Sequence, residues 1–60
     1  MIYQVMIENH DEDFELIEEF KNLEEAIKFA ENYGREHYKC IWIEELDENG
    51  KSIKTIDVEQ

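Results

Sequence analysis

The hydrophobic residues of this chain fall into extended segments on either side of one helical segment. Residues 1–7 are rich in β-branched and aromatic side chains, which predicts a first strand. A polar, turn-forming cluster at residues 9–13 comes next, and Phe14–Phe20 predicts a second strand. Because the intervening loop is short, the two strands are expected to form an antiparallel hairpin. The alternation of the second strand slips at residues 17–19, which predicts a bulge or a bend there.

The middle of the chain carries hydrophobic residues at helical spacing. The apolar stripe consists of Leu23, Ala26, Ile27, Ala30 and Tyr33. Asn22 is a favourable N-cap, and Glu25 stands three residues later, as in a capping box. Gly34 occupies the place where a left-handed C-cap is expected. These signals predict a helix over about residues 23–33.

A second hairpin follows the helix. Tyr38–Leu46 gives the strongest strand signal in the chain, Asn49–Gly50 is a strong hairpin turn, and Ser52–Val58 predicts the last strand. The element order is therefore ββαββ. It predicts a single α+β domain over residues 1–60, in which a four-stranded antiparallel sheet is covered on one face by the helix.

Hydrophobic residues occupy both parities of the predicted strands, although one helix can cover only one face of a sheet. In the strand after the helix, one parity holds Ile41 and Ile43, and the other holds Tyr38, Cys40, Trp42 and Leu46. In the first strand, one parity holds Tyr3, Val5 and Ile7, and the other holds Ile2 and Met6. Two explanations stay open: a curved sheet whose edges and loops wrap the second face, or a contact surface for a partner or a second copy. The sequence does not fix which parity meets the helix.

Charge narrows the range of partners. The chain has 17 Asp and Glu residues against 6 Lys and Arg, a formal net charge of -11. An acidic surface repels the phosphates of nucleic acids and of anionic membranes, so neither is expected as a direct ligand. A partner protein with a basic surface is expected instead. The alternative is that the charges only make a small domain soluble.

Size and cysteine content bear on assembly and location. A chain of 60 residues forms a small core, and such domains usually gain stability from a disulfide, a metal or a partner subunit. The single cysteine, Cys40, excludes an intramolecular disulfide and is interpreted as a small core residue. A homodimer is therefore expected. The start of the chain lacks the pattern of a secretory signal, which favours a cytoplasmic location.

Catalytic chemistry is not indicated by any motif in the sequence. Residues 10–13 are the densest potential metal group, but they lack the alternating ligands and the central glycine of a calcium loop. His10, His37 and Cys40 are too few for a zinc site, and Ser52 has no activating partner nearby in sequence. The sequence thus predicts no enzymatic activity, no catalytic residue, no metal and no cofactor.

The segment Phe20–Gly34 resembles strand-to-helix junctions in many small bacterial and phage proteins. The overall profile of the chain, which is small, acidic and without a catalytic motif, is similar to that of phage-encoded inhibitors of host defence. Some of those inhibitors mimic DNA and occupy basic nucleic-acid sites. The resemblance implies a protein that binds a host defence or nucleic-acid-handling protein, and no residue roles are carried over from it.

The favoured hypothesis is a binding protein with an acidic and aromatic surface. The candidate partner-binding residues are Trp42, Tyr38, Met6, Phe29, Glu15, Glu18, Glu44, Asp47 and Glu48. In this hypothesis Trp42 and the other apolar residues anchor the partner, and the carboxylates steer it. Two alternatives stay open: a structural or regulatory homo-oligomer, and an oligomer that sequesters a small ligand between its subunits.

Overall fold

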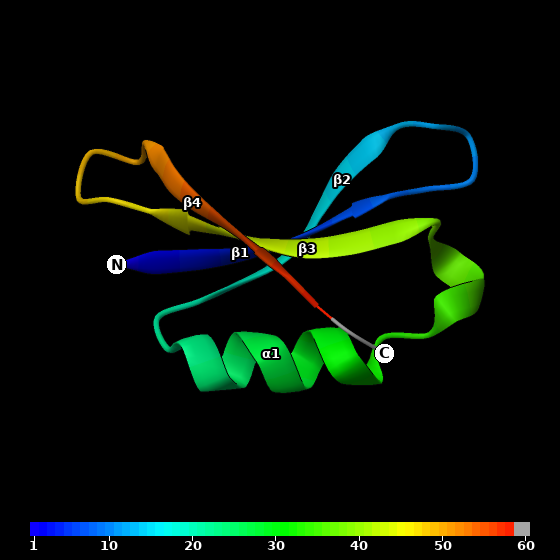
Figure 1. Cartoon of the computed structure of the whole chain (residues 1–60), viewed down its shortest axis with the longest axis horizontal. Coiled ribbons are helices and arrows are strands. Elements are labelled where there is room, and N and C mark those ends of the chain that lie inside the picture. The colour runs from blue at the N-terminus through cyan, green and yellow to red at the C-terminus, as the bar shows by residue number, and fades with distance from the viewer. Residues whose placement is uncertain (59–60) are drawn as a thin grey trace.

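The fold is a four-stranded antiparallel sheet with one helix lying across one face, in a computed structural model that describes residues 1–58 (Figure 1). The elements are β1 (Ile2–Glu8), β2 (Phe14–Phe20), α1 (Leu23–Asn32), a single-turn 3-10 helix (Arg35–His37), β3 (Cys40–Leu46) and β4 (Ser52–Asp57). The strand order is β2-β1-β3-β4, so the two hairpins meet through the central pair β1–β3. The predicted α+β class and ββαββ order are confirmed.

Two alanines of α1 lie against the centre of the sheet. Val5 and Ile43 are directly opposite each other on β1 and β3, and both are fully buried together with Ala26 and Ala30. Alanine has no side chain beyond Cβ, so the helix axis can approach the strands closely. The partly buried residues around this core include Tyr3, Phe20, Leu23, Ile27, Phe29, Ile41, Ile56 and Val58. The residues of β1 and β3 that share parity with Val5 and Ile43 therefore face the helix.

The helix lies within one residue of its predicted bounds, but its C-cap differs from the prediction. The Oδ1 atom of Asn22 accepts hydrogen bonds from the backbone N–H groups of Glu24 (2.8 Å) and Glu25 (3.2 Å), which confirms the N-cap. The C-cap is Tyr33, and Gly34 has a φ of -63°, so the predicted left-handed cap at Gly34 is wrong. Tyr33 instead turns the chain into an extended conformation, in which its ring stacks on Phe29 (5.8 Å between centroids).

Each outer strand contains one bulge, where the strand has an extra residue relative to its inner neighbour. In β2 the register shifts between the partners of Val5 and Met6, which leaves Ile17 as the extra residue. This is the place where the hydrophobic alternation slips, so the predicted bulge is confirmed. In β4 the corresponding shift leaves Ile53 as the extra residue.

The turn between β3 and β4 is closed by an aspartate and a glycine. The Oδ1 atom of Asp47 accepts hydrogen bonds from the backbone N–H groups of Asn49 (2.9 Å) and Lys51 (3.0 Å). Gly50 takes the left-handed position with a φ of 80°. The predicted Asn49–Gly50 turn is confirmed, and its type is a three-residue loop in which only the glycine has positive φ.

The turn between β1 and β2 has the same geometry with a different residue at the left-handed position. The Oδ1 atom of Asn9 accepts hydrogen bonds from the backbone N–H groups of Asp11 (2.9 Å) and Asp13 (3.0 Å), as Asp47 does in the other turn. The left-handed residue here is Glu12, with a φ of 68°. A side chain at this φ brings Cβ close to the backbone, so the Glu12 turn carries a strain that the glycine turn avoids.

Replacing Glu12 by glycine is expected to raise the free energy of unfolding by about 0.5–1 kcal/mol, because the relief of strain exceeds the entropy cost of glycine. The ion pair that the change removes, Glu12 with Lys39 at 3.6 Å, is exposed and contributes little. Urea denaturation of the two proteins measures the difference. The matched control is Gly50→Ala, which should destabilise the protein by a similar amount. A Glu12→Gly protein that is less stable than the parent would contradict the strain argument.

Candidate functional site: the free face of the sheet

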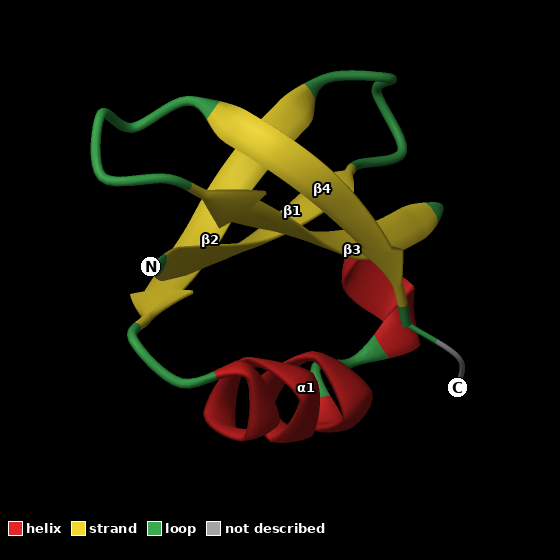
Figure 2. Cartoon of the chain, turned by 60° about the vertical axis from the view of Figure 1, so that its left-hand side comes forward, coloured by secondary structure: helices red, strands yellow, loops and turns green. Residues whose placement is uncertain are grey.

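The face of the sheet opposite α1 has no element covering it among residues 1–58 (Figure 2). Both hairpin tips bend away from the helix on this side (Figure 1). We call the side chains that strand alternation places there the free face. They are Ile2, Gln4, Met6 and Glu8 of β1, Phe14, Leu16 and Glu19 of β2, Cys40, Trp42, Glu44 and Leu46 of β3, and Ser52, Thr55 and Asp57 of β4.

An apolar cluster crosses the free face from β2 to β3. Leu16, Met6 and Trp42 are successive neighbours on β2, β1 and β3. Phe14 contacts Trp42 edge to face, with 5.5 Å between ring centroids and an interplanar angle of 83°. Because β1 lies between β2 and β3, the two rings meet above β1. Phe14 is 70% exposed and Leu16 is 48% exposed, so this Trp42 cluster presents hydrophobic surface to solvent.

Glu44 organises the polar part of the face beside the Trp42 cluster. Its Oε1 atom accepts a hydrogen bond from the indole Nε1–H of Trp42 at 2.8 Å. The hydroxyls of Ser52 and Thr55, both on β4, also donate to the Glu44 carboxylate. Three donors therefore hold one carboxylate, and that carboxylate holds the edge of the indole ring.

Every charged side chain on the free face is a carboxylate. The four are Glu8, Glu19, Glu44 and Asp57, and none of the free-face residues defined above is Lys or Arg. Glu19 accepts a hydrogen bond from the side-chain amide of Gln4 at 2.8 Å. The face therefore combines exposed hydrophobic rings with four carboxylates and has no cation among its own residues, although Arg35 and Lys39 line a hollow next to Asp57.

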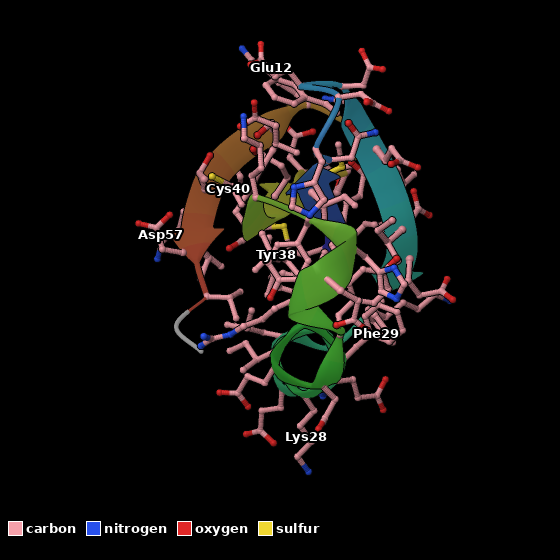
Figure 3. The ribbon with its side chains drawn as sticks, turned by 90° about the vertical axis from the view of Figure 1, so that its right-hand side faces the viewer. Glu12, Lys28, Phe29, Tyr38, Cys40 and Asp57 are labelled. Carbon is pink, nitrogen blue, oxygen red and sulfur yellow. The ribbon has the colours of Figure 1, made fainter. Side chains whose placement is uncertain are left out.

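Three of the residues predicted for partner binding lie together on this face: Trp42, Met6 and Glu44. Tyr38 does not join them. It is buried, its ring stacks on Tyr33 at 6.0 Å, and it lies between the helix and the sheet (Figure 3). The predicted parity failed for Tyr38 because β3 begins only at Cys40, so strand alternation does not extend back to it.

The other predicted residues lie elsewhere on the molecule. Phe29 is a half-buried residue of α1 (Figure 3). Glu15 and Glu18 pair with helix-facing residues of β1 and are exposed along the outer strand β2. Asp47 and Glu48 belong to the β3–β4 turn. These residues are not brought together into one site with Trp42.

Cys40 corrects a further prediction, because its thiol is exposed and is not part of the core. Ile41 and Ile43 of the same strand face the helix, so alternation directs Cys40 to the free face.

The candidate partner-binding residues predicted from the sequence did not include five further residues of the free face. They are Glu8, Phe14, Leu16, Glu19 and Asp57. The shared parity of Phe14 and Leu16 was a usable signal, because two large apolar residues alternate with glutamates on an outer strand. The three carboxylates depend on strand order and register, which local sequence does not encode.

Comparison with known proteins adds no assignment, since no protein-family model, curated protein or solved structure matches the chain. Within residues 1–58, no three His, Cys, Asp or Glu side chains are grouped so that they could hold a metal ion. Neither helix in that range is long and apolar enough to cross a membrane. An open hollow of about 490 Å³ beside β4 is lined by Arg35, Lys39 and Asp57 among others, so its charges favour neither sign of ligand.

Replacing Glu44 by alanine should lower the free energy of unfolding by about 1 kcal/mol, because the half-buried indole N–H loses its charged acceptor. The resonance of the indole N–H, which is unique because the chain has one tryptophan, should move at the same time. Glu31→Ala removes an exposed helix carboxylate with the same change of charge and should stay within about 0.5 kcal/mol of the parent. Equal effects of the two substitutions, with an unmoved indole signal, would contradict the role of Glu44.

Proposed function

We propose that this protein is a small, non-enzymatic binding protein whose free face docks on a basic surface of another protein. One observation carries the proposal: an exposed apolar cluster and four carboxylates share a single uncovered face on which no Lys or Arg lies. The apolar cluster supplies contact area, and the carboxylates favour a partner whose surface is positively charged.

The apolar part of the argument rests on Phe14, Leu16 and Trp42. Interface hot spots are enriched in tryptophan, and exposed apolar patches on small domains commonly serve as contact sites. Phe14 is 70% exposed although its ring lies in edge-to-face contact with the Trp42 ring. Burying both rings against a partner removes this hydrophobic surface from water, which favours association.

The charge part of the argument rests on the whole chain and on the face together. A net charge of -11 attracts basic proteins over distances up to about the Debye length, roughly 8 Å at physiological ionic strength. The free-face carboxylates then meet Lys or Arg at short range. The same charges repel nucleic acids and anionic membranes.

A second copy of the chain is the other candidate occupant of the face. The small core and the exposed Phe14 and Leu16 favour a homodimer. Pairing two free faces, however, would bring both sets of four carboxylates together with no cation on either face. Charge therefore favours a basic partner over a second copy at this surface.

The partner class that fits best is a host defence or nucleic-acid-handling protein. Such proteins present Lys and Arg to bind nucleic acid, and an acidic face can occupy that surface in place of the phosphates. The protein would then act as a DNA-mimicking inhibitor in the cytoplasm of a phage-infected cell. The support for this finer proposal is the acidity of the chain and its similarity in character to phage-encoded inhibitors.

Panning a random peptide display library on the immobilised protein tests the binding function. The selected peptides should be enriched in Lys and Arg together with apolar residues, and their binding should weaken as salt is raised. The Phe14→Ser, Leu16→Ser double variant removes apolar surface at unchanged net charge and should select far fewer peptides. If the double variant selects the same peptides as the parent, the overall acidity of the protein explains the binding, and the proposal is wrong.

A second pair of variants separates the face from the overall charge. Glu8→Gln and Glu31→Gln each remove one negative charge, but only Glu8 lies on the free face. Binding of the selected peptides should fall more for Glu8→Gln. Sedimentation of the parent protein at the same concentrations reports on the homodimer, and a dimer that the Phe14→Ser, Leu16→Ser variant dissociates would assign the face to a second copy.

A further inference from the structure

We propose that the free face recognises arginine: an arginine side chain of the partner stacks on the Trp42 indole while its guanidinium meets the carboxylates of Asp57 and Glu8. This inference rests on the proposed function and narrows it, because it names the residue type that the face selects. It follows from the fixed orientation of the indole, from the carboxylates that remain uncommitted, and from the difference between guanidinium and ammonium groups.

The Trp42 indole is held in one orientation from two sides. Glu44 accepts its Nε1–H at 2.8 Å, and the Phe14 ring meets it edge to face. Fixing a side chain before binding lowers the entropy lost on association. A carboxylate at the N–H edge also adds to the negative potential of the ring, and tryptophan is already the best partner for a cation stacked on an aromatic face.

The carboxylates of the free face divide into two pairs. Glu44 and Glu19 are committed, since they accept hydrogen bonds from neighbouring side chains. Glu8 and Asp57 accept no hydrogen bond and form no ion pair through their side chains within residues 1–58. These two are therefore the carboxylates with capacity to bind a partner's donors.

The two uncommitted carboxylates flank the aromatic rings. Asp57 is the cross-strand partner of Trp42 on β4, and its carboxylate projects away from the core (Figure 3). Glu8 is the cross-strand partner of Phe14 on β2 and of Cys40 on β3. Directly opposed residues have Cβ atoms about 4.5–5.5 Å apart, so each carboxylate is within reach of a group that lies over the rings.

A guanidinium satisfies this arrangement better than an ammonium. It is planar, stacks on aromatic faces, is weakly hydrated, and carries donors on a rigid fork that can reach more than one carboxylate. An ammonium is a compact, strongly hydrated charge that loses more hydration when it is placed against a ring. The face should therefore prefer arginine over lysine at equal partner charge.

The test compares two synthetic peptides that are identical except that every arginine in one is lysine in the other. Chemical-shift titration of the isotope-labelled protein with each peptide, at the same ionic strength, gives the two dissociation constants and locates the binding. The arginine peptide should bind about threefold or more tightly than the lysine peptide. The indole N–H resonance of Trp42 should move with the arginine peptide.

Variants assign the preference to the indole and to the carboxylates. Trp42→Leu should bring the two peptides to equal affinity, and Trp42→Phe should keep part of the preference. Asp57 is exposed, so Asp57→Asn should leave the fold intact. It should weaken binding of the arginine peptide more than the matched charge control Glu31→Gln does. A preference that survives in both Trp42→Leu and Asp57→Asn would overturn the inference.

The remaining outcomes separate this inference from the function on which it rests. If both peptides shift free-face resonances and bind with equal affinity, the face binds basic partners without a preference for arginine, and only the inference fails. If neither peptide shifts free-face resonances, the proposed function fails with it. If shifts appear only at other surfaces, basic partners dock elsewhere and both are again wrong.

Discussion

Close contact between two alanines of α1 and the central strand pair determines the rest of this structure. Ala26 and Ala30 lie against Val5 and Ile43, and all four side chains are fully buried. The central pair joins the first hairpin to the second, so it connects segments that are far apart in the chain. The helix links the two hairpins in the chain and also covers the strand pair at which they meet. The same contacts therefore form the core and hold the two hairpins together.

This arrangement leaves the opposite face of the sheet without a covering layer. Ten helical residues can cover one side of a four-stranded sheet, and no further element is available in residues 1–58 for the other side. A free face of this kind is usually polar, yet here it carries Trp42, Phe14 and Leu16. The hydrogen bonds to Glu44 fix the ring that such a face would otherwise leave free to rotate.

Local signals predicted most of the fold. The N-cap at Asn22, the bulge at Ile17 and the turn at Gly50 each depend on a few consecutive residues, and each was confirmed. The bounds of the helix were also predicted to within one residue. The left-handed C-cap expected at Gly34 was wrong, since Gly34 has a φ of -63° and Tyr33 stacks on Phe29 and on Tyr38.

The candidate site was predicted less completely than the fold. Trp42, Met6 and Glu44 share the parity of one strand pair and were identified, whereas Asp57 became a neighbour of Trp42 only through the register of β3 with β4. Which parity met the helix was open in the sequence, and the burial of Ile43 decides it. The register of a strand and the face that each residue occupies depend on the assembled sheet, so they could not be predicted from the sequence of each strand alone.

The bulges of the outer strands have a consequence for how the sheet can grow. Exposed edges of β-sheets tend to pair with strands of other chains, which leads to aggregation. Here each edge is interrupted at its bulge, at Ile17 in β2 and at Ile53 in β4, and β2 also projects the charges of Glu15 and Glu18. An irregular, charged edge is a poor template for an added strand, so lateral growth of the sheet is opposed. Association perpendicular to the sheet remains open, in the direction of the exposed rings.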